Sequence, residues 1–304
     1  MLSAPARERI VDMVAREETH IRTVLCPVDF SDASEHQALF AADLCQLYGA
    51  RLVLHHNVED VSAGVAVSWM WAGKHAAFAW DIEAERRMKS FVGRIPAWIP
   101  MQARITHGPP TGCVLAVAGI VDADVLVLTI HGRTGEDHMS LTEQVLERSC
   151  CAVMALHEAT GDPNAKRFAC RSGALHRVLA PTSFSETSAA AVRLCFDLAR
   201  RLPIELHLLH IEPSRTPVSE PDSAQAEADR RRLSGLLPND LRERAKLHVA
   251  AGDPAREIPA MAEALGASLI VMGEHTRAPL RRWFTRDTGR SVLREANCPV
   301  WYVP

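Results

Sequence analysis

The chain has 304 residues, of which 47% are hydrophobic and 23% charged, and its formal net charge at pH 7 is −3. This length predicts two domains of ordinary size, and the small net charge gives no argument for binding nucleic acid or a membrane surface. No stretch reaches the ~18–20 uninterrupted apolar residues of a membrane span, and the N-terminus lacks the apolar core of a signal peptide. Eight cysteines without paired spacing are typical of a reducing compartment, so we expect a cytoplasmic protein.

Strands and helices alternate along the first half. Runs rich in Val, Ile and Leu predict buried strands, and the segments between them have helical spacing of apolar residues. Ser31, Asp32 or Ser34 can cap the first helix, and Gly49 ends it. The expected strands are 23–30, 51–58, 103–108, 124–130 and 152–156, and the expected helices are 31–48, 74–92, 111–121 and 141–149.

The second half repeats this order of elements. Its expected strands are 177–183, 205–211, 246–251, 268–273 and 299–303, with helices at 187–201, 222–236, 254–265 and 287–296. A polar segment with Gly and Pro separates the halves and predicts a linker. We therefore expect a helical arm at 1–22, a first domain at 23–157, a linker at 158–175 and a second domain at 176–304.

The two halves also share their sequence. Residues 23–34, TVLCPVDFSDAS, match residues 177–188, RVLAPTSFSETS, and residues 107–133 align with 251–277. Because the repeat is about 150 residues long, it indicates one whole domain duplicated rather than a solenoid unit of 20–50 residues.

Alternating strands and helices with continuous apolar strands predict an α/β fold with a parallel sheet covered on both faces. Ligands of such sheets bind beyond the carboxyl ends of the strands, where the strand order reverses. The residues that the sequence places there are Asp29, His107-Gly108 and His131-Gly132 in the first half, and Ser183, Gly252-Asp253 and 273–276 in the second.

Four motifs resemble the universal stress protein family. They are Pro27-Val28-Asp29-x-Ser31 after the first strand, Gly252-Asp253-Pro254, a strand that ends Val-Met-Gly-x-His at 271–275, and a closing Cys-Pro-Val at 298–300. The resemblance spans most of the chain and implies two tandem doubly wound domains of the adenine nucleotide alpha hydrolase-like kind, with strand order 3-2-1-4-5. It also implies that the last strands, 152–157 and 299–303, pair to form an intramolecular pseudo-dimer, since duplication turns a two-fold interface into an internal one.

In nucleotide-binding members the resemblance implies a loop of the form G-x-x-G, nine residues, then G-S or G-T, with ATP or AMP as the ligand. Glycines let backbone amides approach phosphates, and the hydroxyl adds a donor. The first half departs from this pattern: Thr129 replaces the leading glycine, Gly132 is kept, the spacer is about three residues short, and Met139-Ser140 is the best match to the closing pair.

The second half keeps the nine-residue spacing and Gly273 but has Thr276 in place of the next glycine and Arg286-Asp287 in place of Gly-Ser. Ser183 also replaces the aspartate of the first strand. The carboxylate of Asp287 would repel a phosphate. With these departures, neither half carries a complete phosphate-binding loop.

Two hypotheses follow. The favoured one is a non-enzymatic stress-response protein that acts by binding and whose loops are degenerate, the glycines serving only turns and Asp29 only capping the next helix. The alternative is an adenine-nucleotide sensor that uses the first half. Its candidate residues are Pro27, Val28, Asp29, Gly108, Gly132 and Ser140; their degenerate equivalents are Thr182, Ser183, Gly252, Gly273, Arg286 and Asp287.

Other chemistry finds little support in the sequence. It has no P-loop and no G-x-S-x-G elbow, so we expect no enzyme, and its fourteen histidines have no metal-ligand spacing, so we expect no metal. A basic stripe and a tryptophan-bearing insertion at 60–80 are typical of a solvated helix face and of core packing, and the alternative for both is contact with a protein partner; a homodimer is a further alternative. The stripe is formed by Arg282, Arg286, Arg290 and Arg294.

Overall fold

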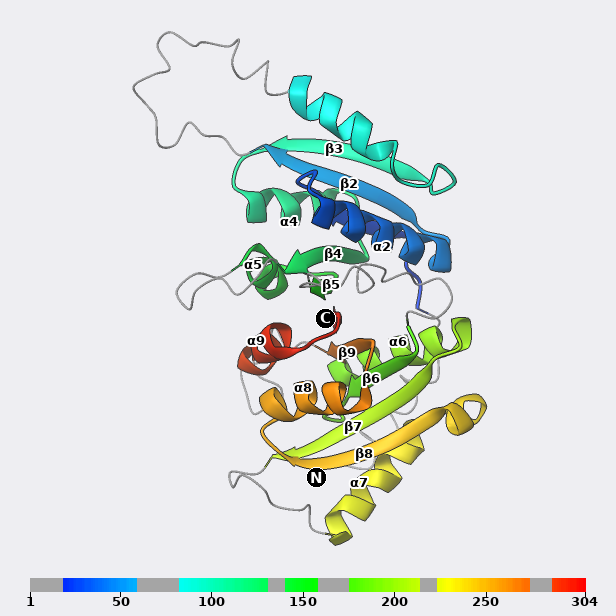
Figure 1. Cartoon of the computed structure of the whole chain (residues 1–304). Helices are drawn as coiled ribbons and strands as arrows, with labels where there is room; N and C mark the ends of the chain where they lie inside the picture. Colours follow the sequence, from blue (N-terminus) through cyan, green and yellow to red (C-terminus); the bar gives the residue numbers. More distant parts are fainter. Residues whose placement is uncertain (1–18, 59–81, 131–139, 158–174, 214–222, 274–285) are drawn as a thin grey trace. The chain divides into compact units, whose positions relative to one another are not determined.

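A computed structural model describes residues 19–58, 82–130, 140–157, 175–213, 223–273 and 286–304. The chain divides into two compact units (Figure 1). The N-terminal unit lies within Ile21–Cys151, and the C-terminal unit combines Ala152–His157 with Ser172–Pro304. Most of the helical arm, the 60–80 insertion and the linker that the sequence predicts lie outside the described residues. In the described part, no helix is both long and apolar enough to cross a bilayer.

The N-terminal unit contains a parallel sheet with the order β3-β2-β1-β4. Four helical segments accompany this sheet. The strands are β1 (Thr23–Pro27), β2 (Arg51–Val58), β3 (Met101–His107) and β4 (Val125–Ile130). The helices are α2 (Asp32–Tyr48), the helical residues 82–92, α4 (Pro110–Ile120) and α5 (Leu141–Arg148).

The C-terminal unit contains a sheet with the order β5-β10-β9-β6-β7-β8, in which every neighbouring pair except β5 and β10 is parallel. The strands are β5 (Ala152–His157), β6 (Arg177–Pro181), β7 (Glu205–Pro213), β8 (Ala245–Gly252), β9 (Leu269–Gly273) and β10 (Val300–Val303). The helices are α6 (Glu186–Arg201), α7 (Ser223–Leu236), the 3-10 turn η2 (Asn239–Arg244), α8 (Pro254–Leu265) and α9 (Arg286–Glu295).

The doubly wound α/β prediction is confirmed. The second half runs β8-β7-β6-β9-β10, which is the order 3-2-1-4-5, and the four strands of the N-terminal unit follow the first four places of the same order. The last strands pair antiparallel, with Trp301 opposite Met154. Because β5 and β10 both belong to the C-terminal unit, the pseudo-dimer of two whole domains remains a prediction.

The first strand of each half is shorter than predicted, because a tight turn follows it. β1 ends at Pro27 and β6 at Pro181, and the residues Phe30 and Phe184 then take the left-handed conformation, with φ of 67° and 57°. Such angles are unusual for a bulky side chain, so the turn is held by its surroundings. Gly49 ends α2 in the left-handed conformation, as the sequence predicts.

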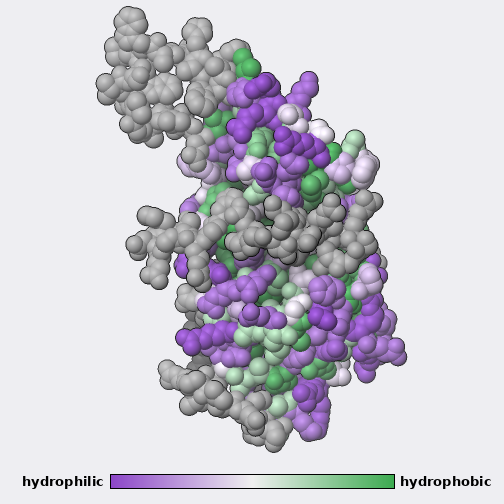
Figure 2. Space-filling view, in the orientation of Figure 1, coloured by the Kyte–Doolittle hydropathy of each residue, from purple (hydrophilic) through white to green (hydrophobic). Residues whose placement is uncertain are grey.

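The central strands of both sheets are almost wholly buried, whereas the edge strands β3 and β8 are partly exposed. Val24, Leu25 and Cys26 of β1 are 0% exposed, as are Val178, Leu179 and Ala180 of β6. The surface seen in Figure 2 is largely hydrophilic over the described residues, with hydrophobic residues scattered among the polar ones. This partition is what the hydrophobic effect requires of a sheet covered on both faces.

Acid should destabilise the protein through a buried histidine of β2. His55 is 1% exposed, with Nε2 2.7 Å from Thr106 Oγ1. Burial, and then the positive charge of His56, lower the pKa of His55 from 6.5 to about 4. The unfolded chain therefore binds more protons than the folded one below pH 6.5, and we expect His55 to remove about 3 kcal/mol of stability by pH 4.

The variant His55→Leu tests this, since the second half carries the buried Leu209 at the same place. Urea unfolding at pH 7.5 and pH 4.5 should show a smaller loss of stability in His55→Leu than in the wild type. An identical loss in both proteins would exclude His55 as the source of the acid sensitivity.

Candidate functional site

The carboxyl ends of β1 and β4 mark the point where strand order reverses in the N-terminal unit. The two strands pair through Val24 with Val125 and Leu25 with Leu126. Beyond these pairs the buried side chain of Gln37 joins them: its Nε2 donates to the carbonyls of Pro27 (2.7 Å) and Val127 (2.8 Å). Its Oε1 accepts from Thr129 Oγ1 at 2.6 Å. The side chain of Gln37 therefore takes part of the space where a ligand of a doubly wound sheet usually binds.

Pro27, Val28 and Asp29 lie together at this edge, as predicted. The N–H of the buried Val28 donates to the His55 carbonyl (2.7 Å), and its carbonyl accepts from His56 Nδ1 (2.8 Å). Asp29 is exposed, and its Oδ1 accepts from both the N–H (2.9 Å) and the hydroxyl (2.6 Å) of Ser31. Ser31, and not Asp29, is the N-cap of α2. The backbone of Val28 and the carboxylate of Asp29 are thus engaged in building the turn.

Gly108 and Gly252 serve equivalent turns, between β3 and α4 and between β8 and α8. Their φ angles, 128° and 149°, lie in a region that side chains rarely adopt. In the first half the Gly108 carbonyl accepts from Asn57 Nδ2 at 2.8 Å. A Cβ atom at Gly252 would lie 2.9 Å from Glu257 Oε1. Turn geometry alone therefore requires glycine at both positions.

Ser140 begins α5 through a reciprocal capping box with Glu143. The Ser140 hydroxyl oxygen accepts from the Glu143 N–H (3.2 Å), and Glu143 Oε2 accepts from the Ser140 N–H (2.8 Å) and hydroxyl (3.1 Å). Glu143 is only 3% exposed. A buried carboxylate is therefore already bonded to the groups that the sequence offered to a phosphate. Gly132 lies outside the described residues.

In the second half the equivalents of Val28 and Asp29 form a network of hydroxyl groups. Thr182 is 1% exposed, and its Oγ1 donates to Ser188 Oγ (3.1 Å) and accepts from the Phe184 N–H (3.1 Å). Ser183 Oγ donates to Ser185 Oγ at 3.0 Å. These hydroxyls hold the turn into α6 together without a carboxylate.

Gly273 is in contact with the first turn of α6. A Cβ atom at Gly273 would lie 2.7 Å from the Ser188 nitrogen and closer still to the Thr187 carbonyl. Close packing of a helix on a strand therefore accounts for this glycine. Arg286 and Asp287 are the first two residues of α9.

Sequence reasoning missed a set of three side chains that occurs once in each unit. The Phe30 ring lies 4.2 Å from the His56 ring, and the Arg87 guanidinium lies 4.7 Å above the same phenyl ring. Phe184, His210 and Arg232 repeat the set, at 4.6 and 3.9 Å. The signal was available, because His56 and His210 are related by the same offset as Phe30 and Phe184. We call these the Phe–His–Arg sets.

Both histidines of the Phe–His–Arg sets are bonded to the end of the first strand. His210 Nδ1 lies 2.9 Å from the Thr182 carbonyl, as His56 Nδ1 does at 2.8 Å from Val28. Burial lowers the pKa of both imidazoles, and the bond to the carbonyl opposes that shift. Since a carbonyl only accepts, Nδ1 carries the proton in each ring. In the C-terminal unit, His210 Nε2 lies 3.9 Å from Asp229 Oδ2, on the helix that also carries Arg232.

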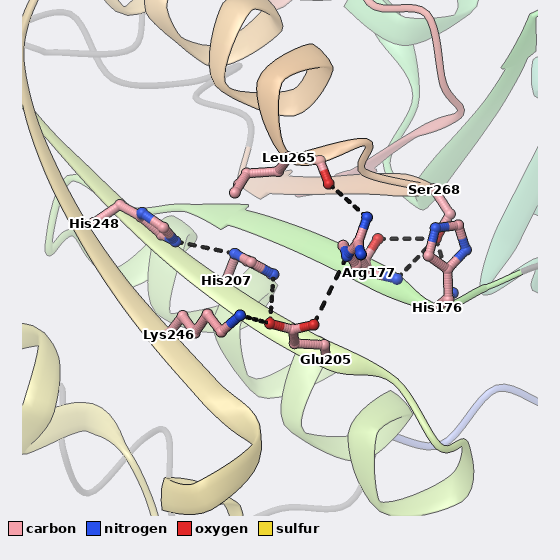
Figure 3. A network of polar contacts seen from close by, with 8 residues as sticks. All are labelled: His176, Arg177, Glu205, His207, Lys246, His248, Leu265 and Ser268. Carbon is pink, nitrogen blue, oxygen red and sulfur yellow. Dashed lines mark hydrogen bonds and ion pairs between the residues drawn. The ribbon is translucent and has the colours of Figure 1, made fainter.

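A further polar cluster ties the starts of β6, β7 and β8 together (Figure 3). His207 Nδ1 is 2.9 Å from His248 Nε2, and His207 Nε2 is 3.4 Å from Glu205 Oε1. Glu205 also pairs with Lys246 and, at 3.7 Å, with Arg177. Burial lowers the pKa of both histidines. The cluster lies at the opposite ends of the strands from the candidate site, so its role is to join strands.

Few described side chains are suited to act as a nucleophile or to bind a metal ion. Burial raises the pKa of Cys26, Cys45 and Cys298 to about 12, so these thiols stay protonated near neutral pH. Over the ranges that the structure describes, no group of three or more His, Cys, Asp or Glu side chains is arranged to hold a metal ion.

Comparison with known proteins identifies the family. The model of the universal stress protein family matches residues 20–157 and again 174–304. A universal stress protein of Methanocaldococcus jannaschii is 27% identical over 141 residues, which are 42% of this chain and 81% of that protein.

Two crystal structures show the same fold over more than nine tenths of the chain. A universal stress protein of Archaeoglobus fulgidus has a TM-score of 0.67 at 17% identity, covering 92% of this chain and 95% of its own. A putative universal stress protein of Pseudomonas aeruginosa has a TM-score of 0.58 at 16% identity, covering 96% and 94%. With two matches to the family model that together span most of its length, the chain belongs to the universal stress protein family as a tandem, two-domain member.

Proposed function

We propose that this protein is a non-enzymatic, cytoplasmic stress-response protein that acts by binding, and that the nucleotide loops of both halves are degenerate. One observation carries the proposal: the hydroxyl and the N–H of Ser140, at the start of α5, are both hydrogen-bonded to the carboxylate of Glu143. Ser140 is the residue at which we expect the last donors of the phosphate loop, from the resemblance to nucleotide-binding members.

A phosphate needs unoccupied N–H and hydroxyl donors and an uncharged or positive surrounding. Here the N–H and hydroxyl of Ser140 already bond the Glu143 carboxylate, which is only 3% exposed to solvent. Two negative charges at a few ångströms inside a protein repel by several kcal/mol at an effective dielectric constant of about 20. A phosphate at the start of α5 would have to displace a buried, hydrogen-bonded carboxylate.

The second half supports the same proposal through a different contact. Gly273, the one loop glycine kept there, is covered by the first turn of α6 around Thr187 and Ser188. A glycine used for helix packing leaves no open backbone for a phosphate. Degenerate loops in both halves would favour binding to a protein partner over nucleotide chemistry. The buried thiols of Cys26 and Cys45, whose pKa burial raises to about 12, are poor nucleophiles near neutral pH.

One observation favours the alternative, an ATP or AMP sensor in the first half. Phe30 and His56 are partly exposed at the end of β1, whereas their counterparts Phe184 and His210 are each 5% exposed. Asp29 is also exposed beside them. The N-terminal unit therefore keeps the more accessible edge, and a direct binding measurement has to decide between the two functions.

Native mass spectrometry of the full chain with millimolar ATP or AMP tests the proposal. We expect the mass of the protein alone, because the phosphate donors are occupied. A bound nucleotide that is lost in Asp29→Ala and kept in Asp32→Ala would contradict the proposal and establish the sensor. Asp32 is the matched control, since it is an exposed aspartate in the first turn of α2.

A further inference from the structure

The two Phe–His–Arg sets take their arginines from equivalent helices, and these helices differ in the chemistry of the residue at one buried position. Residues 82–91, IEAERRMKSF, align without a gap with residues 227–236, EADRRRLSGL, and this alignment places Arg87 on Arg232. Burial follows the alignment. Met88 and Phe91 are 4% and 2% exposed, and their counterparts Leu233 and Leu236 are 0% and 7% exposed. At one buried position the chemistry changes, since Ala84 (6% exposed) corresponds to Asp229 (1% exposed).

In the C-terminal unit the carboxylate of Asp229 completes the set. Its Oδ1 accepts from an Arg232 Nη atom at 2.7 Å, and its Oδ2 lies 3.9 Å from His210 Nε2 and accepts from Gln225 Nε2 at 2.7 Å. An anion thus lies between the guanidinium and the imidazole. Together with the phenyl ring, this arrangement is a built anion site that the chain fills with its own side chain.

The N-terminal unit has the same ring, imidazole and guanidinium but a methyl group in place of the carboxylate. Within the described ranges, no carboxylate lies at ion-pair distance from Arg87, whereas the neighbouring Arg86 pairs with Glu83 at 2.9 Å. Arg87 is exposed and His56 is partly exposed, so a ligand can reach both. The stacking of Arg87 on Phe30 fixes the guanidinium plane above the ring and lowers the entropy lost on binding.

We propose that His56 and Arg87 bind the anionic group of a small ligand, a phosphate or a carboxylate, at the position that the Asp229 carboxylate has in the C-terminal unit. The site lies at the end of β2 and on the helical residues 82–92, and it uses neither Ser140 nor the loop glycines of the proposed function. The inference therefore goes beyond the proposed function and does not depend on it.

Binding at this site should take up a proton. His56 Nδ1 donates to the Val28 carbonyl, so an anion at Nε2 is favoured once that nitrogen is also protonated. Burial and the charge of Arg87 lower the pKa of His56, His55 lies next to it, and Asp29 acts in the opposite direction. An anion that adds to the effect of Asp29 should therefore raise the pKa of His56.

The experiment is a titration of the full chain with inorganic phosphate at constant ionic strength, followed by NMR of the His56 ring protons and the Arg87 Nε–H group. We expect saturable shifts of both signals, and a higher pKa of His56 with saturating phosphate than without it. Arg87→Gln should abolish the His56 shift. Arg86→Gln, which removes the adjacent exposed arginine, should leave it unchanged. Acetate as a second probe identifies the anion: shifts with both probes mean a general oxyanion site, and shifts with phosphate alone mean a phosphate site.

A second variant tests the internal comparison. Ala84→Asp places a carboxylate three residues before Arg87, as Asp229 stands before Arg232, and should abolish the phosphate response without lowering the melting temperature. The proposal is overturned if neither probe gives saturable shifts, or if the shifts persist in Arg87→Gln. Because Arg87 is exposed, that variant should fold even if Ala84→Asp does not.

Discussion

Replacing Asp229 by alanine is expected to lower the free energy of unfolding by about 3–5 kcal/mol, the range found when one partner of a buried ion pair is removed. The Asp229 side chain is 2% exposed, bonds Arg232 at 2.7 Å and accepts from Gln225 at 2.7 Å. Its loss leaves a guanidinium charge against the Phe184 ring with no compensating anion, and a cavity beside His210.

The control for Asp229 lies on the same helix. Glu227 pairs with Arg231 at 2.9 Å, but the two side chains are 68% and 79% exposed. Exposed pairs contribute at most about 1 kcal/mol, so Glu227→Ala should change stability little. Urea unfolding of both variants provides the measurement. Equal losses in the two would mean that the Asp229 carboxylate is not what holds Arg232 in place.

The second large effect is expected at Gly273. Gly273→Ala should cost about 1–3 kcal/mol or more, because its methyl group would overlap the backbone of Thr187 and Ser188 and push α6 away from β9. The clash involves backbone atoms, so no side-chain rotation relieves it. If Gly273 served only an open ligand loop, the added methyl group would leave stability nearly unchanged.

Gly119→Ala is the matched control for Gly273→Ala. Gly119 lies within α4, and a Cβ atom there would meet nothing within 4 Å. Alanine is preferred to glycine in a helix by about 1 kcal/mol, so this variant should be slightly more stable than the wild type. Thermal unfolding of the two variants should therefore give melting temperatures that move in opposite directions.

The results on Asp229 and Gly273 bear on function as well as on stability. At both residues the protein's own atoms fill the space: the Asp229 carboxylate pairs with Arg232, and the first turn of α6 packs against Gly273. The C-terminal unit is thus internally satisfied at its site edge. The N-terminal unit has Ala84 and Thr129 at the corresponding positions, and Arg87 and His56 remain accessible.

Local sequence determined the architecture. The apolar runs of the strands, the Ser31 cap and the Gly49 stop of α2 are patterns within a few residues, and the duplication let each half confirm the other. The strand order came from the family resemblance. The end of the first strand was predicted too late, because the turn at Phe30 depends on packing against His56 and Phe91 as well as on the bonds from Ser31 to Asp29.

Only the tertiary structure showed which contacts the candidate residues make. From sequence, Ser140 and Gly273 could equally serve a phosphate or the fold; in the structure Ser140 bonds the buried Glu143, and Gly273 packs against the first turn of α6. The Phe–His–Arg sets join a turn, a strand and a helix far apart along the chain. Periodicity and capping rules describe residues that are close in sequence. Whether a hydrogen-bond donor is already bonded, or the space next to a glycine is already filled, depends on distant residues that the fold brings there.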